Sequence, residues 1–155
     1  RLGRTGNIPL GYYNDPVKTA EVFVVAGDGK RYSMGGDFAR WTEEGQLVML
    51  GRGSVSINSG GEKIYPEEVE GVLKALPSVY DVLVVGVPDE RWGERVTAVV
   101  QPTAGATVTV EDIDAHCRGK LAGYKIPRSV VLVDEVVRSP SGKADYRWAK
   151  ATAAG

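Results

Sequence analysis

The chain has 155 residues, of which 43% are apolar and 25% are charged, and its formal net charge is −1. This is the composition of an ordinary globular protein, and the length is sufficient to bury one core, or one core with an appendage. Acidic and basic residues are interspersed, so the charge gives no sign of a nucleic-acid-binding or membrane-surface protein. The longest apolar runs are far too short to span a bilayer.

A single cysteine, Cys117, rules out an internal disulfide and fits a reducing cytoplasm, which is the location we expect. The chain begins at Arg1 rather than Met, and no signal peptide is visible. We therefore expect a fragment of a longer protein.

Residues 1–50 are predicted to be rich in β structure. Residues 21–25 and 30–32 flank an Ala-Gly-Asp-Gly turn, and residues 38–42 and 46–50 flank Glu-Glu-Gly, so both pairs favour hairpins. Residues 16–21 favour a helical turn. This segment has too few apolar residues to close a core of its own, and we expect it to be partly disordered or packed on a neighbouring domain.

Residues 51–155 contain alternating helix and strand signals. A short extended stretch crosses Gly60-Gly61 and leads into a helix over residues 66–76, which begins with Pro66 and the acidic pair Glu67-Glu68. The remaining predicted elements are strands at 79–87, 95–101 and 129–133, a helix capped by Thr109, a polar loop at 138–143 and a final helix at 145–153. This order predicts an α+β domain in which helices pack on a mixed or antiparallel three-stranded sheet.

Three stretches follow one another in an order that resembles a known family. They are Gly36-Asp37, the segment from Gly51 to Glu70 with the wording Gly-Gly-Glu-Lys-Ile-Tyr-Pro-Glu-Glu-Val-Glu, and Ser139-Pro-Ser-Gly-Lys143. Together they resemble the adenylate-forming enzymes, and the second stretch looks like the fatty-acyl-CoA synthetase branch. The resemblance covers essentially the whole chain and implies that residues 1–50 end the large N-terminal domain, while residues 51–155 form the mobile C-terminal domain.

The resemblance also implies a reaction and its substrates. Members of the family join a carboxylic acid to ATP, releasing pyrophosphate, and then pass the acyl group to the thiol of coenzyme A. The acid here is expected to be fatty or lipid-derived, and the magnesium that accompanies ATP is expected on the large domain. Because the phosphate loop and the acyl and adenine pockets also belong to that domain, the fragment alone is expected to be inactive.

Site residues follow from the motifs that match. Lys143 matches the adenylation lysine, and Asp37 and Arg52 match the residues that bind the ribose. Tyr-Ser-Met-Gly-Gly precedes Asp37, where relatives more often have Arg-Thr-Gly or Lys-Thr-Gly. Ser54 occupies the position at which the mobile domain turns, where the family usually has Asp or Lys.

The remaining site residues concern coenzyme A. Gly60, Gly61 and Glu62 match the loop that lines the pantetheine tunnel, and Trp92 and Arg118 match contacts to the coenzyme A nucleotide. No metal-ligand spacing is present anywhere in the chain.

Two alternatives remain open at this point. One is an acyl-adenylate ligase or adenylation domain that loads a carrier protein, for which the same lysine would serve. The Gly-Gly-Glu-Lys-Ile-Tyr-Pro wording nevertheless argues against activation of amino acids. The other is a stand-alone binding module without chemistry.

Overall fold

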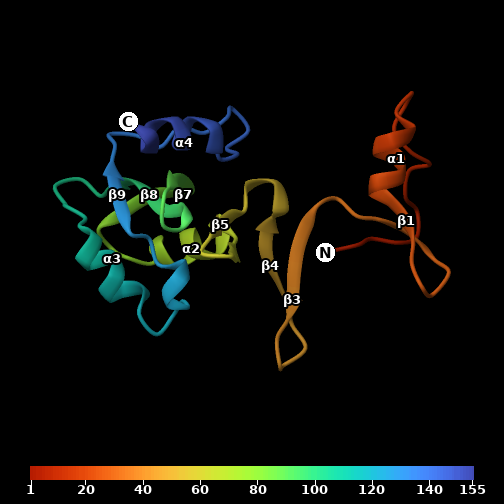
Figure 1. The fold of residues 1–155 in the computed structure, drawn as a ribbon, viewed down its shortest axis with the longest axis horizontal. Coiled ribbons are helices and arrows are strands. Elements are labelled where there is room, and N and C mark those ends of the chain that lie inside the picture. Colours follow the sequence, from red (N-terminus) through yellow and green to blue (C-terminus); the bar gives the residue numbers. More distant parts are fainter. The chain divides into compact units, whose positions relative to one another are not determined.

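The computed structural model describes residues 1–155, which form two compact units, Arg1–Ser54 and Val55–Gly155 (Figure 1). No residue of the first unit is buried, whereas the second unit contains every buried residue. The prediction that the N-terminal segment cannot close a core of its own is therefore confirmed.

The first unit consists of one short helix and two hairpins. Its elements are α1 (Pro16–Val22), β1 (Phe23–Val25), β2 (Arg31–Ser33), β3 (Asp37–Trp41) and β4 (Leu47–Arg52). Strand β1 pairs with β2, and β3 with β4, both antiparallel. Both predicted hairpins and the predicted helical turn are confirmed. The 3₁₀ helix η1 (Gly53–Val55) follows β4 and contains the boundary between the units.

The second unit is built on a five-stranded sheet. Its strands are β5 (Ile57–Ser59), β6 (Glu62–Ile64), β7 (Val79–Asp89), β8 (Gly93–Pro102) and β9 (Ser129–Leu132). The order is β6-β5-β8-β7, and β9 also pairs with β8. Strand β9 runs parallel to β8, and the other pairings are antiparallel. The predicted α+β class with a mixed sheet is confirmed.

The predicted number of three strands was wrong, because the segment before the first long helix adds β5 and β6. Gly60 and Gly61 both have positive φ, at 60° and 85°. Two successive residues with positive φ form the tight turn that joins hairpin strands with the correct twist. The glycine pair within the predicted extended stretch therefore closes a hairpin.

Three helices and a 3₁₀ turn accompany the sheet: α2 (Pro66–Leu73), α3 (Val110–Cys117), η2 (Gly123–Lys125) and α4 (Tyr146–Ala154). Helix α2 ends three residues before the predicted position. Ala75 and Leu76 donate backbone hydrogen bonds to Val72 and Leu73, at 3.2 and 3.0 Å, so the last turn tightens instead of continuing the α-helix.

Both faces of the β7–β8 hairpin are covered. Val82 and Val84 belong to the cluster that contains the apolar residues of α2 and α3, and Leu83 and Val85 belong to the cluster that contains Ala149 of α4. Figure 1 shows α4 on one side of the sheet and α3 on the other. Successive side chains of a strand point to opposite faces, so a strand covered on both sides reads as a continuous apolar run.

Candidate functional site

Lys143 lies at the end of a tight, exposed turn between β9 and α4. The Ser139 N–H donates to the Lys143 carbonyl, and the Gly142 N–H donates to the Ser139 carbonyl, both at 2.8 Å. Gly142 has a φ of 77°, which few other residues adopt without strain. Lys143 is exposed, and its ammonium has no hydrogen bond or ion pair within the chain. The turn therefore presents an exposed cation that no acidic group of the chain neutralises.

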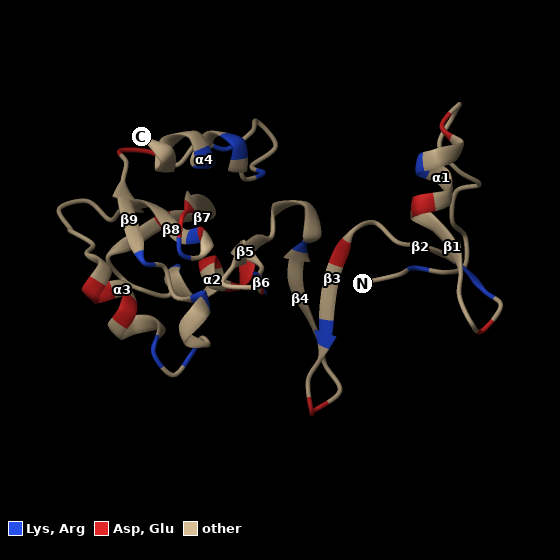
Figure 2. Ribbon diagram, in the orientation of Figure 1, with Lys and Arg blue, Asp and Glu red and all other residues tan.

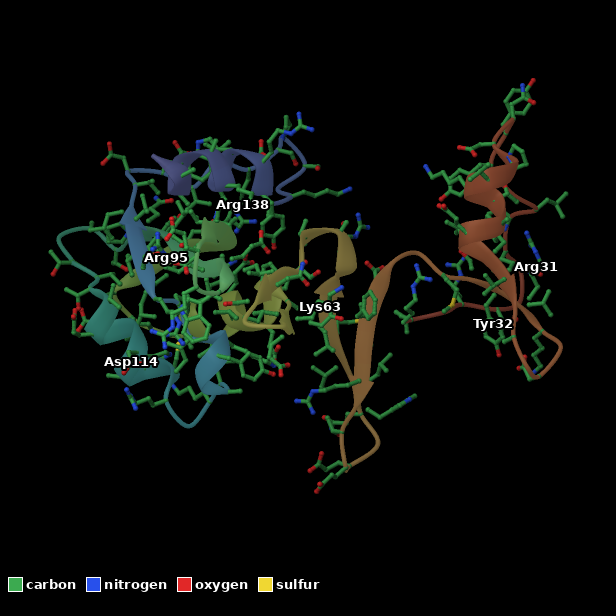
Figure 3. All side chains as sticks on the ribbon, in the orientation of Figure 1. Arg31, Tyr32, Lys63, Arg95, Asp114 and Arg138 are labelled. Atoms are coloured by element: carbon green, nitrogen blue, oxygen red, sulfur yellow. The ribbon has the colours of Figure 1, made fainter.

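An arginine at the base of the turn binds a carboxylate on the sheet. Arg138 Nε and Nη2 donate to the two oxygens of Asp81 on β7, at 2.7 and 2.8 Å (Figure 3 labels Arg138). Lys74 also contacts Asp81, at 3.2 Å. Burial raises the pKa of Asp81, but the hydrogen bonds from Arg138, the Val82 N–H and Lys74 outweigh it and lower the pKa to about 2.

A buried carboxyl group lies on α2, in contact with the first turn of α4. Glu70 is 6% exposed and accepts hydrogen bonds from the Val84 N–H at 2.9 Å and the Tyr146 hydroxyl at 3.3 Å. Burial raises the pKa of Glu70 to about 7, and burial together with the Glu70 charge raises the pKa of Tyr146 as well. The sequence analysis missed this group, although its position between Val69 and Leu73 on the apolar side of α2 was a usable signal.

Asp37 and Arg52, the two predicted ribose-binding residues, are brought together in the first unit. They are opposite each other in the β3–β4 pair, and Arg52 Nε lies 3.1 Å from Asp37 Oδ1. Their side chains are 34% and 69% exposed, so the pair remains open to a ligand. Lys143 belongs to the second unit.

Gly60 and Trp92, both predicted to contact coenzyme A, are also in contact. The Gly60 N–H donates to the Trp92 carbonyl at 2.8 Å, and a Cβ at Gly60 would lie 3.1 Å from Cε3 of the indole. The guanidinium groups of Arg91 and Arg128 lie 4.8 and 4.6 Å from the Trp92 ring. Gly61 and Glu62 complete the hairpin and are exposed.

Arg118 follows α3 and lines a cavity of about 450 Å³. Its Nε donates to Asp114 Oδ2 at 2.6 Å, and α3 carries acidic residues, drawn in red in Figure 2. Arg128 lines the same cavity as Arg118 and stacks on Trp92. Arg128, which the sequence analysis missed, therefore lies between the two predicted nucleotide contacts, Arg118 and Trp92. Guanidinium groups suit a phosphate, and the aromatic ring of Trp92 suits a base, so Arg118, Arg128 and Trp92 have the chemistry to hold a nucleotide.

Cys117 and His116, the single cysteine and the single histidine, take structural positions. Cys117 is fully buried in the core, and burial raises its pKa. His116 Nε2 lies 3.0 Å from the Val72 carbonyl and contacts Lys120. No three side chains of His, Cys, Asp or Glu are grouped so as to hold a metal ion. None of the helices combines the length and apolar character needed to cross a bilayer.

The family model for the AMP-binding enzyme C-terminal domain matches residues 68–143, which end on the candidate lysine. Residues 68–143 belong to this family. A 3-oxocholest-4-en-26-oate–CoA ligase of Rhodococcus rhodochrous is 62% identical to the chain over 149 residues, which are 96% of the chain and 27% of that ligase. A medium/long-chain-fatty-acid–CoA/3-oxocholest-4-en-26-oate–CoA ligase of Mycolicibacterium smegmatis is 60% identical with the same coverage.

A solved structure is also similar to this chain over most of its length. ATP-bound MatB from Rhodopseudomonas palustris superposes with a TM-score of 0.75 and 35% identity, covering 92% of this chain and 27% of MatB. The resemblance to the C-terminal part of acyl-CoA synthetases is thus confirmed. The chain spans 27% of the length of both curated ligases.

Proposed function

We propose that the chain is the C-terminal part of an ATP-dependent acyl-CoA synthetase. The enzyme would activate a fatty or other lipid-derived acid as an acyl-adenylate and transfer it to coenzyme A. The support comes from the family, from relatives that are named CoA ligases, and from the lysine-bearing turn. In this proposal residues 1–50 end a large domain that binds ATP, magnesium and the acid, and Ser54 marks the hinge. A cytoplasmic location remains a prediction.

The observation that carries the proposal is the exposed ammonium of Lys143 on a turn anchored at its base by Arg138 and Asp81. During adenylation a carboxylate approaches an α-phosphate, and both groups are anionic. A cation about 4 Å from a unit negative charge is worth about 4 kcal/mol at an effective dielectric of about 20. Stabilisation of that size corresponds to roughly a thousandfold in rate.

The other predicted site residues have chemistry that suits the remaining parts of the substrates. Asp37 has acceptor oxygens for the two ribose hydroxyls, and the neighbouring Arg52 has donors for them. Arg118 and the Arg128–Trp92 stack suit the phosphate and adenine of coenzyme A. The hairpin of Gly60, Gly61 and Glu62 borders Trp92 and would line the path of the pantetheine arm.

The test is ATP–pyrophosphate exchange by the full-length protein with fatty, steroid-derived and aryl acids, followed by addition of coenzyme A. Exchange with an acyl-CoA product supports the synthetase and names the class of acid. Exchange without that product points instead to a ligase that loads a carrier protein. Absence of exchange with every acid refutes the proposed activity.

The same assay tests the assigned lysine. Lys143→Ala should slow adenylate formation by roughly a thousandfold, while transfer to coenzyme A from supplied acyl-adenylate should remain near the wild-type rate. Lys150→Ala is the matched control, because Lys150 lies on α4 and pairs with Glu94 at 3.0 Å. Equal loss of both half-reactions in Lys143→Ala would contradict the assigned role.

A further inference from the structure

The turn that carries Lys143 is almost isolated from the rest of the domain. Its hydrogen bonds join Ser139, Ser141, Gly142 and Lys143 to one another. The four residues from Pro140 to Lys143 are exposed, so burial does not hold the turn in place. Its position on the domain must therefore be set by the residues at its two ends.

At the first end, one guanidinium group connects the turn with the sheet. Nη1 of Arg138 donates to the Gly142 carbonyl at 3.3 Å, while Nε and Nη2 bind both oxygens of Asp81. Asp81 lies on β7, whose following residues from Val82 to Val87 are buried. A planar guanidinium fixes three donor directions at once, which a lysine ammonium cannot do. Arg138 thus links the residue before Lys143 to a rigid strand.

At the second end, the start of α4 is held just as firmly. Asp145 Oδ1 accepts a hydrogen bond from the Trp148 N–H at 2.9 Å and caps the helix. Tyr146 donates to the buried Glu70 at 3.3 Å. The backbone of Lys143 is therefore fixed from both sides, although its side chain is exposed.

We propose that Arg138 is a positioning residue for adenylation: bound to Asp81, it holds the turn so that Lys143 projects from a fixed point of the domain. This inference rests on the proposed role of Lys143. The requirement is geometric, because a displacement of about 1 Å of a catalytic group costs on the order of a hundredfold in rate. A purely structural ion pair would instead affect both half-reactions, or neither, through the stability of the domain.

The experiment compares Arg138→Gln, Asp81→Asn and the double variant in the full-length protein. Each should slow adenylate formation by about a hundredfold and leave transfer from supplied acyl-adenylate within about twofold of wild type. The double variant should be no slower than the slower single variant, because both changes break the same link. In the double variant the only charge that loses its partner is that of Lys74, which is exposed, so this variant should fold even where Arg138→Gln does not.

The matched control is Lys125→Gln, which removes a comparably buried ion pair to Glu68 on α2, with Nζ–Oε2 at 2.7 Å, and does not touch the turn. It should leave the ratio of the two half-reaction rates unchanged. An unchanged adenylation rate in the double variant would overturn the inference while leaving the proposed function intact. A normal adenylation rate in Lys143→Ala would instead overturn the lysine assignment itself.

Discussion

Glu70→Gln should make the stability of the chain less dependent on pH. The Glu70 side chain is 6% exposed, with its carboxyl group between the backbone of β7 and the Tyr146 hydroxyl. A glutamine amide fits the same space, can accept from the Val84 N–H through its oxygen and can donate to Tyr146 through its nitrogen. The substitution therefore removes the ionisation and keeps both contacts.

The size of the effect follows from the pKa of Glu70. Burial raises this pKa from 4.5 to about 7, even though the hydrogen bonds from Val84 and Tyr146 oppose the change. Between these two values the folded chain holds a proton that the unfolded chain has released, so the free energy of unfolding falls as the pH rises. The difference between the two pKa values corresponds to a loss of about 3 kcal/mol in the free energy of unfolding. The whole loss is present only above the folded pKa.

Urea unfolding of residues 1–155, followed by circular dichroism from pH 4 to pH 8.5, measures the effect. Wild type and Glu70→Gln should be equally stable near pH 4, and the variant should be more stable by about 3 kcal/mol at pH 8.5. Glu90→Gln, which replaces an exposed glutamate, should give no such divergence. A difference between Glu70→Gln and wild type that stays constant across this range would show that the buried carboxyl group does not hold its proton.

Two further predictions concern stability. Thr109→Ala removes the capping box in which Thr109 and Asp112 exchange hydrogen bonds, and should lower the free energy of unfolding by about 1 kcal/mol, whereas Thr107→Ala, at an exposed loop position, should change it by less than about 0.5 kcal/mol. Equal urea midpoints for both variants would contradict a role of the cap. Gly60→Ala should cost about 1–2 kcal/mol for its positive φ plus the displacement of Trp92, so it should unfold at lower urea than Gly61→Ala, which has only the conformational cost. The reverse order would refute the contact with the indole.

Local chemistry was enough to predict most of the elements. Thr109 with its acidic first turn predicted the start of α3, and the run from Val82 to Val87 predicted a buried strand; both are present. These signals lie within a few residues of one another, so they hold whatever surrounds them. The two three-residue strands β5 and β6 were missed, because segments of that length are too short to show a period of two.

The motifs that resemble those of the adenylate-forming enzymes were enough to predict Lys143, Asp37 and Arg52 as site residues, because a motif consists of consecutive residues and can be recognised without a structure. Only the tertiary structure showed what holds the lysine turn. Arg138 and Asp81 are 57 positions apart, and Tyr146 and Glu70 are 76 positions apart. The order of strands in the sheet and the packing of α4 on it decide which distant polar groups meet, and a buried carboxylate or hydroxyl acquires its partner and its pKa only there.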